Sequence, residues 1–313
     1  MTRFDHKKHQ QRQIQARKVK VARWRQRKIS VYDLDVKRWQ NVEVKSDRYF
    51  LPFSRTVQIP QTLDFMSFGG LDDTEPEKHF FTNTGAMYTL FDIQGADSVC
   101  IPKPIRSMVK GRGCFSACYL HDFVYACGGI NILEGVLSGC ERYDVAKDQW
   151  HEISDLNVAR KNSSVCPIAA DSIFIFGGQT VDDRVTGVIE QYLVSANTWL
   201  ILPVKMHFRL SFLTTFKVSP YQILLLGGIV EGESEVIKEN FITNQVSLYD
   251  IRYPEVTLIG ELPSDFVSVS HPHFDDKGSL ILVSEDDQTE YPKMIEYDIN
   301  KFLANPKNTL VIE

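Results

Sequence analysis

The chain has 313 residues, of which 43% are hydrophobic and 24% charged, and its formal net charge is −5. This composition is ordinary for a globular protein with a large buried core. Its longest apolar runs, such as QILLLGG at 222–228, are too short to span a bilayer, and no secretory signal is recognisable. We therefore expect a cytoplasmic protein whose six cysteines, all between Cys100 and Cys166, are reduced thiols.

The N-terminus is strongly basic. Residues 1–28 carry eleven Lys or Arg against the single acid Asp5, a charge of +10, which leaves −15 for residues 29–313. Good helix formers and poorly spaced apolar residues predict an arm that is disordered or helical. The alternation in VKVARW at 19–24 leaves one additional strand as an alternative. Such an arm can bind an acidic surface on a polymer, a nucleic acid or a protein. Association with mitochondria or with the cytoskeleton is the alternative location.

The rest of the chain repeats one pattern of short strands. The first copy, SVYDLDVKRWQNV at 30–42, has a tyrosine strand and then Trp39, six residues after Asp33. Four copies with an apolar strand, a glycine pair, a polar loop and an aromatic strand follow. Their glycine pairs are Gly69-Gly70, Gly128-Gly129, Gly177-Gly178 and Gly227-Gly228. The last copy, LILVSEDD at 280–287 with MIEYDIN at 294–300, lacks the glycines. Six copies about 53 residues apart favour a propeller array.

Glycine pair, tyrosine strand and tryptophan together resemble the kelch repeat, most clearly at 112–202. The resemblance implies an all-β propeller of four-stranded blades, in which the glycines end the second strand and Tyr and Trp pack between blades. On this basis Trp150 and Trp199 are expected to be buried, and Gly178 to lie at a tight turn beside the next blade.

We predict a kelch-type β-propeller of about six blades over residues 29–313, preceded by the basic arm. Only the last two strands of the first blade are evident before residue 49, so that blade is expected to be incomplete. An irregular ring, or a chain that is part of a longer protein, is the alternative.

Candidate chemistry is sparse in the sequence. His271 and His273 are two residues apart, so on a strand they would lie on one face and could bind one metal ion. No further ligands stand out, and a loop between blades is favoured. Cys114 and Cys118 are interpreted as small buried hydrophobes. We therefore expect no catalytic residue, cofactor or metal, and a non-catalytic protein-interaction scaffold or adaptor. An enzyme or small-ligand binder with its site in the central channel is the alternative.

Charges predict where a partner protein binds. Loops after the glycine pairs are acidic, whereas the crossovers between blades are basic, and both emerge on one face of a propeller. In kelch proteins that face commonly docks a partner. The predicted partner-binding residues are Arg55, Arg112, Arg160, Arg209, Asp182 and Asp183. The alternative is a solvated rim held by local ion pairs.

Overall fold

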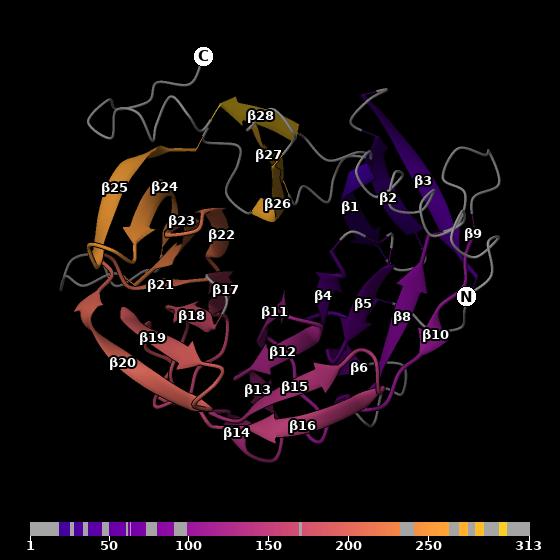
Figure 1. Ribbon diagram of the computed structural model, residues 1–313, viewed down its shortest axis with the longest axis horizontal. Helices are drawn as coiled ribbons and strands as arrows, with labels where there is room; N and C mark the ends of the chain where they lie inside the picture. Colours follow the sequence, from indigo (N-terminus) through magenta and orange to yellow (C-terminus); the bar gives the residue numbers. More distant parts are fainter. Residues whose placement is uncertain are drawn as a thin grey trace.

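The computed structural model shows strands and no helix in the residues that it describes (Figure 1). These residues are 19–25, 28–33, 37–45, 50–60, 62, 64–72, 80–90, 99–168, 171–231, 241–262, 269–274, 279–284 and 294–298. No helix in this part of the chain is long and apolar enough to cross a membrane.

The two best copies of the repeat each form a four-stranded antiparallel sheet. One is β11 (Ser116–Leu120), β12 (Phe123–Cys127), β15 (Cys140–Asp144) and β16 (Gln149–Ile153). The next is β17 (Ser164–Ile168), β18 (Ser172–Phe176), β19 (Val188–Leu193) and β20 (Thr198–Lys205). A short hairpin, β13 (Ile130–Asn131) and β14 (Gly135–Val136), lies in the loop after β12.

The flanking copies follow the same order. Before them come β4 (Arg55–Gln58), β5 (Asp64–Phe68), β8 (Gly85–Thr89) and β10 (Lys103–Pro104), with the hairpin β6 (Leu71–Asp72) and β7 (Phe80–Phe81). The sheet after them is built on β23 (Gln222–Val230). One edge of β23 pairs with β21 (Leu210–Ser211) and β22 (Thr214–Ser219). Its other edge pairs with β24 (Phe241–Asp250), which in turn pairs with β25 (Glu255–Glu261). A three-stranded sheet contains β26 (Val269–Phe274), β27 (Ser279–Ser284) and β28 (Met294–Asp298).

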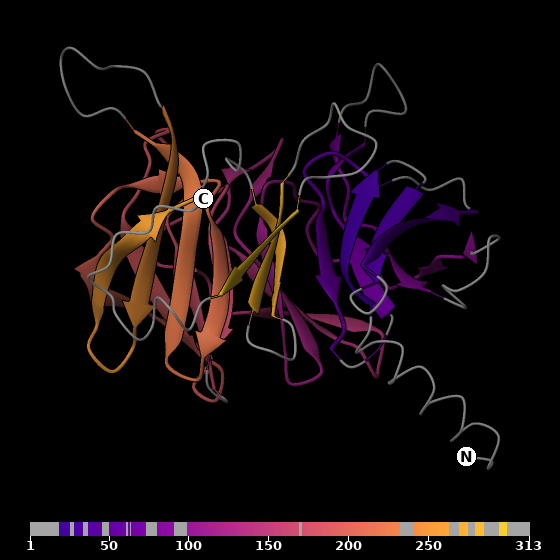
Figure 2. The same ribbon diagram turned by 90° about the horizontal axis from the view of Figure 1, so that it is seen from above.

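The sheets stand around a common axis, so the fold is a β-propeller. Strands β4, β11, β17 and β22 lie nearest the centre, and β16, β20 and β25 lie on the rim (Figure 1). Seen from above, the strands run roughly along the axis, which places their connections at the two ends of the ring (Figure 2). We call the end that carries the glycine-pair loops and the crossovers the loop face.

The first sheet differs from the prediction, because it has four strands rather than two. They are β1 (Val19–Arg25), β2 (Lys28–Asp33), β3 (Arg38–Val44) and β9 (Val99–Cys100). Residues 19–25, assigned to the basic arm, pair antiparallel with β2 from Val19↔Asp33 to Arg25↔Lys28, so sheet pairing overrides their weak helix propensity. β9 pairs in parallel with β3 from a position much later in the chain. Residues 1–18 lie outside the described residues, and the arm there stays a prediction.

The core lies between neighbouring sheets, as the aromatic landmarks predict. Trp150 packs in one cluster with Phe68 of the preceding sheet, and Trp199 in another with Tyr125 of its own preceding sheet. Both tryptophans are buried, and their Nε1 atoms donate to the carbonyl oxygens of Arg106 and Ser154, each at 3.0 Å. These contacts fasten each outer strand to the crossover that precedes its sheet. The side chain of Trp24 lies outside the described residues.

The glycine pairs close the loop-face ends of the second strands. At Gly177 and Gly178 the backbone φ angles are +61° and +98°, which favour a residue without a Cβ. The amide of Gly178 donates to Leu210 O in the next crossover at 2.8 Å, so this glycine does lie beside the next sheet. The pair therefore fixes both a turn and a junction between sheets.

Candidate functional site

Two of the predicted partner-binding residues are in the interior. Arg112 and Arg160 are both 0% exposed, so neither side chain is available to a partner. Each guanidinium forms an ion pair with a carboxylate on the third strand of its own sheet, Arg112 with Glu141 at 2.6 Å and Arg160 with Glu190 at 2.5 Å. The prediction that they form a basic docking surface is therefore wrong, because a buried acid outside the loops neutralises each of them.

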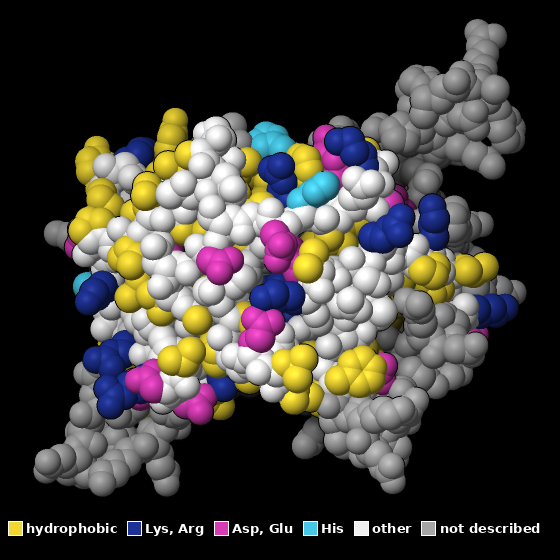
Figure 3. Space-filling model, turned by 90° about the horizontal axis from the view of Figure 1, so that it is seen from below, with side chains coloured by type: hydrophobic (Ala, Val, Ile, Leu, Met, Phe, Trp, Pro, Cys, Tyr) yellow, Lys and Arg dark blue, Asp and Glu magenta, His cyan; other side chains and the backbone are white. Residues whose placement is uncertain are grey.

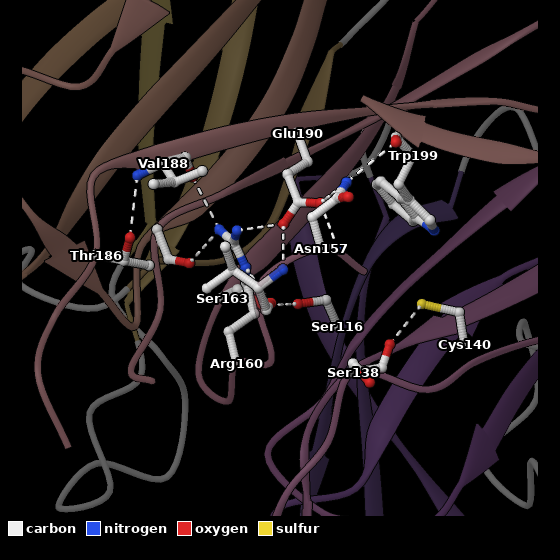
Figure 4. Close-up of polar contacts among 12 residues, drawn as sticks. Ser116, Ser138, Cys140, Asn157, Arg160, Ser163, Thr186, Val188, Glu190 and Trp199 are labelled. Atoms are coloured by element: carbon white, nitrogen blue, oxygen red, sulfur yellow. Dashed lines mark hydrogen bonds and ion pairs between the residues drawn. The ribbon is translucent and has the colours of Figure 1, made fainter. Parts of the chain in front are cut away.

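The Arg160 network shows what these pairs do (Figure 4). Arg160 Nη1 donates to Gly177 O and Val188 O, and Nη2 donates to Glu190 Oε1. Glu190 also accepts from the backbone amides of Asn157 and Val158 at 2.8 and 3.2 Å. Burial lowers the pKa of the Arg160 guanidinium, an effect that the Glu190 carboxylate opposes. The network joins a crossover, a glycine turn and the third strand of the sheet into one unit.

Arg112 repeats this arrangement one sheet earlier. Its Nη1 donates to Gly128 O and Gly139 O, and Glu141 accepts from the amides of Val109 and Lys110. Sequence reasoning missed both pairs. The sequence signal for them is an arginine 16 or 17 residues before the first glycine of a pair, in the two units that have a glutamate two residues before the tyrosine of the third strand.

The other predicted residues lie at the surface of the loop face or near it. Arg55 is half-buried, and its Nε donates to Phe115 O at 2.5 Å. Arg209 pairs with Glu231 at 3.4 Å. Asp183 pairs with Lys161 at 2.7 Å, and Asp182 with Arg184 at 3.5 Å. Apart from the hydrogen bond of Arg55, these contacts are local ion pairs, the alternative considered for the rim.

In three sheets, a cation in a crossover forms an ion pair on this face with an acid in the loop after the second strand. Lys110 and Glu134 are 2.8 Å apart, and their hydrogen bond raises the pKa of Lys110 and lowers the pKa of Glu134. Lys161–Asp183 and Arg209–Glu231 occupy the corresponding places in the next two sheets. Because both groups of each pair are partly or largely exposed, each pair contributes only about 0–1 kcal/mol to stability.

Large apolar side chains are exposed on the same face. They lie in the loops after the second strands and in the crossovers, and include Phe53, Phe80, Ile132, Leu133, Val181 and Phe212. Leu133 is 95% exposed. On the side of the ring that Figure 3 shows, hydrophobic, basic and acidic side chains are interspersed with one another. Exposed apolar groups on loops of a rigid scaffold are typical of a protein-binding surface.

Potential metal ligands do not cluster in the described part of the chain. No group of three or more His, Cys, Asp or Glu that could hold a metal ion is found among the described residues. Residues 269–274 form β26 rather than the loop predicted around His271 and His273, whose side chains lie outside the described residues.

The cysteine thiols differ in burial, and this difference predicts which of them reacts first. Burial raises the pKa of Cys166 to about 12, and a hydrogen bond to Cys140 together with burial raises that of Cys127. Cys114 alone among the six is not buried. We expect iodoacetamide at about pH 8 to modify Cys114 first in the native protein, because alkylation needs an accessible thiolate. Peptide mass spectrometry over time measures this, and equal rates at Cys114 and Cys166 would contradict the burial described here.

A family model of the kelch motif matches residues 111–157, from the crossover before β11 to the crossover after β16. The chain is a β-propeller that contains a kelch motif. The matched stretch contains Arg112, Gly128, Glu141 and Trp150, so the kelch propeller is recognised in one of its most regular sheets.

Two similar proteins carry the same repeat. Kelch-like protein 38 of Rattus norvegicus is 27% identical over 85 residues, and that of Homo sapiens is 24% identical over 85 residues. In both cases the match covers 27% of this chain and 14% of the relative. The kelch propeller thus matches about one seventh of the length of these relatives. Kelch-repeat propellers typically mediate protein–protein interactions.

Proposed function

We propose that this kelch propeller is a non-catalytic adaptor that binds another protein through its loop face. The observation that carries the proposal is the group of exposed apolar side chains on that face, above all Leu133 and Val181 at the tips of two neighbouring loops. Exposed apolar side chains gain free energy when a partner removes them from water. The sheets beneath them are fixed by buried ion pairs and glycine turns, so the loops are presented on a rigid support.

The basic N-terminal residues have a secondary part in this proposal. The charge of residues 1–28 lets them contact an acidic surface on the partner or on a polymer, and such contacts weaken as salt is added. The adaptor acts in the cytoplasm. Since β1 begins at Val19, an arm deletion that leaves the first sheet intact removes residues 1–18 only. Such a deletion is expected to weaken binding in low salt more than in high salt.

Two pairs of substitutions test the docking face. Partners are identified by proximity labelling in the source cell, and the affinity of the purified full chain for them is then measured by calorimetry. Leu133→Ser with Val181→Ser should weaken binding at least about tenfold, because both apolar anchors are lost. Leu200→Ser with Leu258→Ser, on the exposed outer strands β20 and β25, is the matched control and should bind normally.

Two other outcomes would contradict the proposed function. Loss of binding in the outer-strand variant alone would place the partner on the wall of the ring and overturn the docking face. Stoichiometric copper, iron or zinc in the purified protein, measured by elemental mass spectrometry, would instead favour an enzyme or small-ligand binder with its site in the central channel.

A further inference from the structure

Four equivalent residues form an arc around the axis on the loop face. Each lies two residues before one of the central strands β4, β11, β17 and β22, and successive residues are joined through their backbones. Cys114 N donates to Phe53 O at 3.1 Å, Asn162 N to Cys114 O at 2.8 Å, and Phe212 N to Asn162 O at 2.8 Å. We call Phe53, Cys114, Asn162 and Phe212 the axial arc.

The backbone of the axial arc is left-handed at every member. The φ angles are 61° at Phe53, 55° at Cys114, 55° at Asn162 and 56° at Phe212. Asparagine adopts this conformation readily, whereas a bulky aromatic residue rarely does. For the backbone alone, therefore, asparagine would serve better than phenylalanine at both ends of the arc. A strained residue that the surrounding structure retains points to a role other than folding.

The two phenylalanines are not explained by packing either. Phe53 is 52% exposed and Phe212 is 49% exposed, so each presents about half of its surface to solvent. They precede β4 and β22, which lie on opposite sides of the centre of the ring (Figure 1). Between them the arc offers the partly exposed Cys114 and the nearly buried Asn162. The axial arc is thus apolar at its two ends and weakly polar between them.

The charges around the arc argue against an acidic ligand. Three crossover cations on this face are paired with loop acids, in Lys110–Glu134, Lys161–Asp183 and Arg209–Glu231. Arg112 and Arg160 are buried against their own glutamates. A carboxylate or phosphate would have to compete with these intramolecular acids, whereas an apolar side chain would not.

We propose that the axial arc docks an apolar segment of another protein, which packs aromatic or aliphatic side chains against Phe53 and Phe212. This names the chemistry of the partner, and it rests on the proposed function of the loop face. An acidic or phosphorylated segment is the other outcome of the test. Because the contact is apolar, its affinity depends little on ionic strength.

The decisive variant is Phe53→Asn with Phe212→Asn in the full chain. Asparagine keeps the left-handed backbone, as Asn162 already does, so the thermal midpoint should stay the same or rise. Tyr221→Asn with Tyr253→Asn is the matched control, since these two exposed aromatic residues lie in turns at the opposite end of the ring.

The probe is a phage-displayed library of random cyclic peptides, selected on the full chain and then tested on both variants. We expect enriched peptides with aromatic or aliphatic tips, at least tenfold weaker binding to the phenylalanine variant, and normal binding to the tyrosine variant. Enrichment of acidic or phosphate-mimicking peptides would overturn the proposal, as would recovery of no peptide that distinguishes the phenylalanine variant from the original chain.

The same variants separate this inference from the proposed function. If the partner found by proximity labelling is lost from the Leu133→Ser, Val181→Ser variant but binds the phenylalanine variant normally, the loop face docks the partner and the axial arc does not. If neither variant affects that partner, both proposals fail.

Discussion

Replacing Arg160 by leucine should lower the free energy of unfolding by about 3–5 kcal/mol, because it leaves the buried Glu190 carboxylate without its cation. The same substitution also removes hydrogen bonds to the carbonyl oxygens of Gly177 and Val188. The measurement is chemical denaturation of the full chain, followed by tryptophan fluorescence. Lys161→Leu is the neighbouring control; its partner Asp183 is mostly exposed, so the loss should be at most about 1 kcal/mol.

The chain itself suggests the compensating change. In the following sheet, Leu210 occupies the place of Arg160: Gly178 N donates to Leu210 O as Gly129 N donates to Arg160 O. Ser247 there occupies the place of Glu190, since each lies opposite the residue two positions before the glycine pair. Arg160→Leu with Glu190→Ser should therefore recover at least about 2 kcal/mol relative to Arg160→Leu alone. Additive losses would mean that the ion pair contributes little beyond its separate hydrogen bonds.

Gly177→Val is expected to cost at least about 3 kcal/mol. A Cβ at this position would lie 2.0 Å from the backbone oxygen of Leu210, and the φ angle of +61° already disfavours a side chain. Neither a carbonyl in a hydrogen-bonded crossover nor the turn can shift without breaking the junction between two sheets. The thermal midpoint should fall by several degrees.

Gly139 provides the matched control for this glycine. An added Cβ there meets no atom within 4 Å, and its φ angle is not positive. Gly139→Val should change stability by no more than about 0.5 kcal/mol. Equal losses at Gly177 and Gly139 would show that the close approach to Leu210 is not what makes glycine necessary.

The propeller was predictable because its repeat uses residues whose physical roles are unambiguous. A glycine pair after an apolar strand needs positive φ, and a tryptophan at a fixed spacing needs a large buried surface; Gly178, Trp150 and Trp199 meet both expectations. Arg112 and Arg160 failed the same reasoning. A charged residue in a polar crossover is normally exposed, and its burial depends on a glutamate about 30 residues away in the chain.

Two other features could be read from local patterns in part or not at all. Residues 19–25 have the composition of a basic arm, and their alternation offered a strand only as the alternative; pairing with β2 makes them a strand. Phe53 and Phe212 look like core residues in the sequence, but the left-handed backbone of the crossovers leaves them half exposed. Both outcomes depend on how distant segments meet, which a propensity or a hydrophobic pattern does not encode.

The contact that joins the two ends of the described chain has a consequence for biosynthesis. β1 lies beside β26, so the ring closes between segments about 250 residues apart. During synthesis β1 precedes β26, so it can pair with β2 early, whereas its contact with β26 forms only after the residues between them have been made. Until then the first sheet lacks the neighbouring sheet that contains β26, and surface that is uncovered in this way promotes aggregation. Completion of the ring is therefore expected to be a late step of folding, because it joins segments that lie far apart in the sequence.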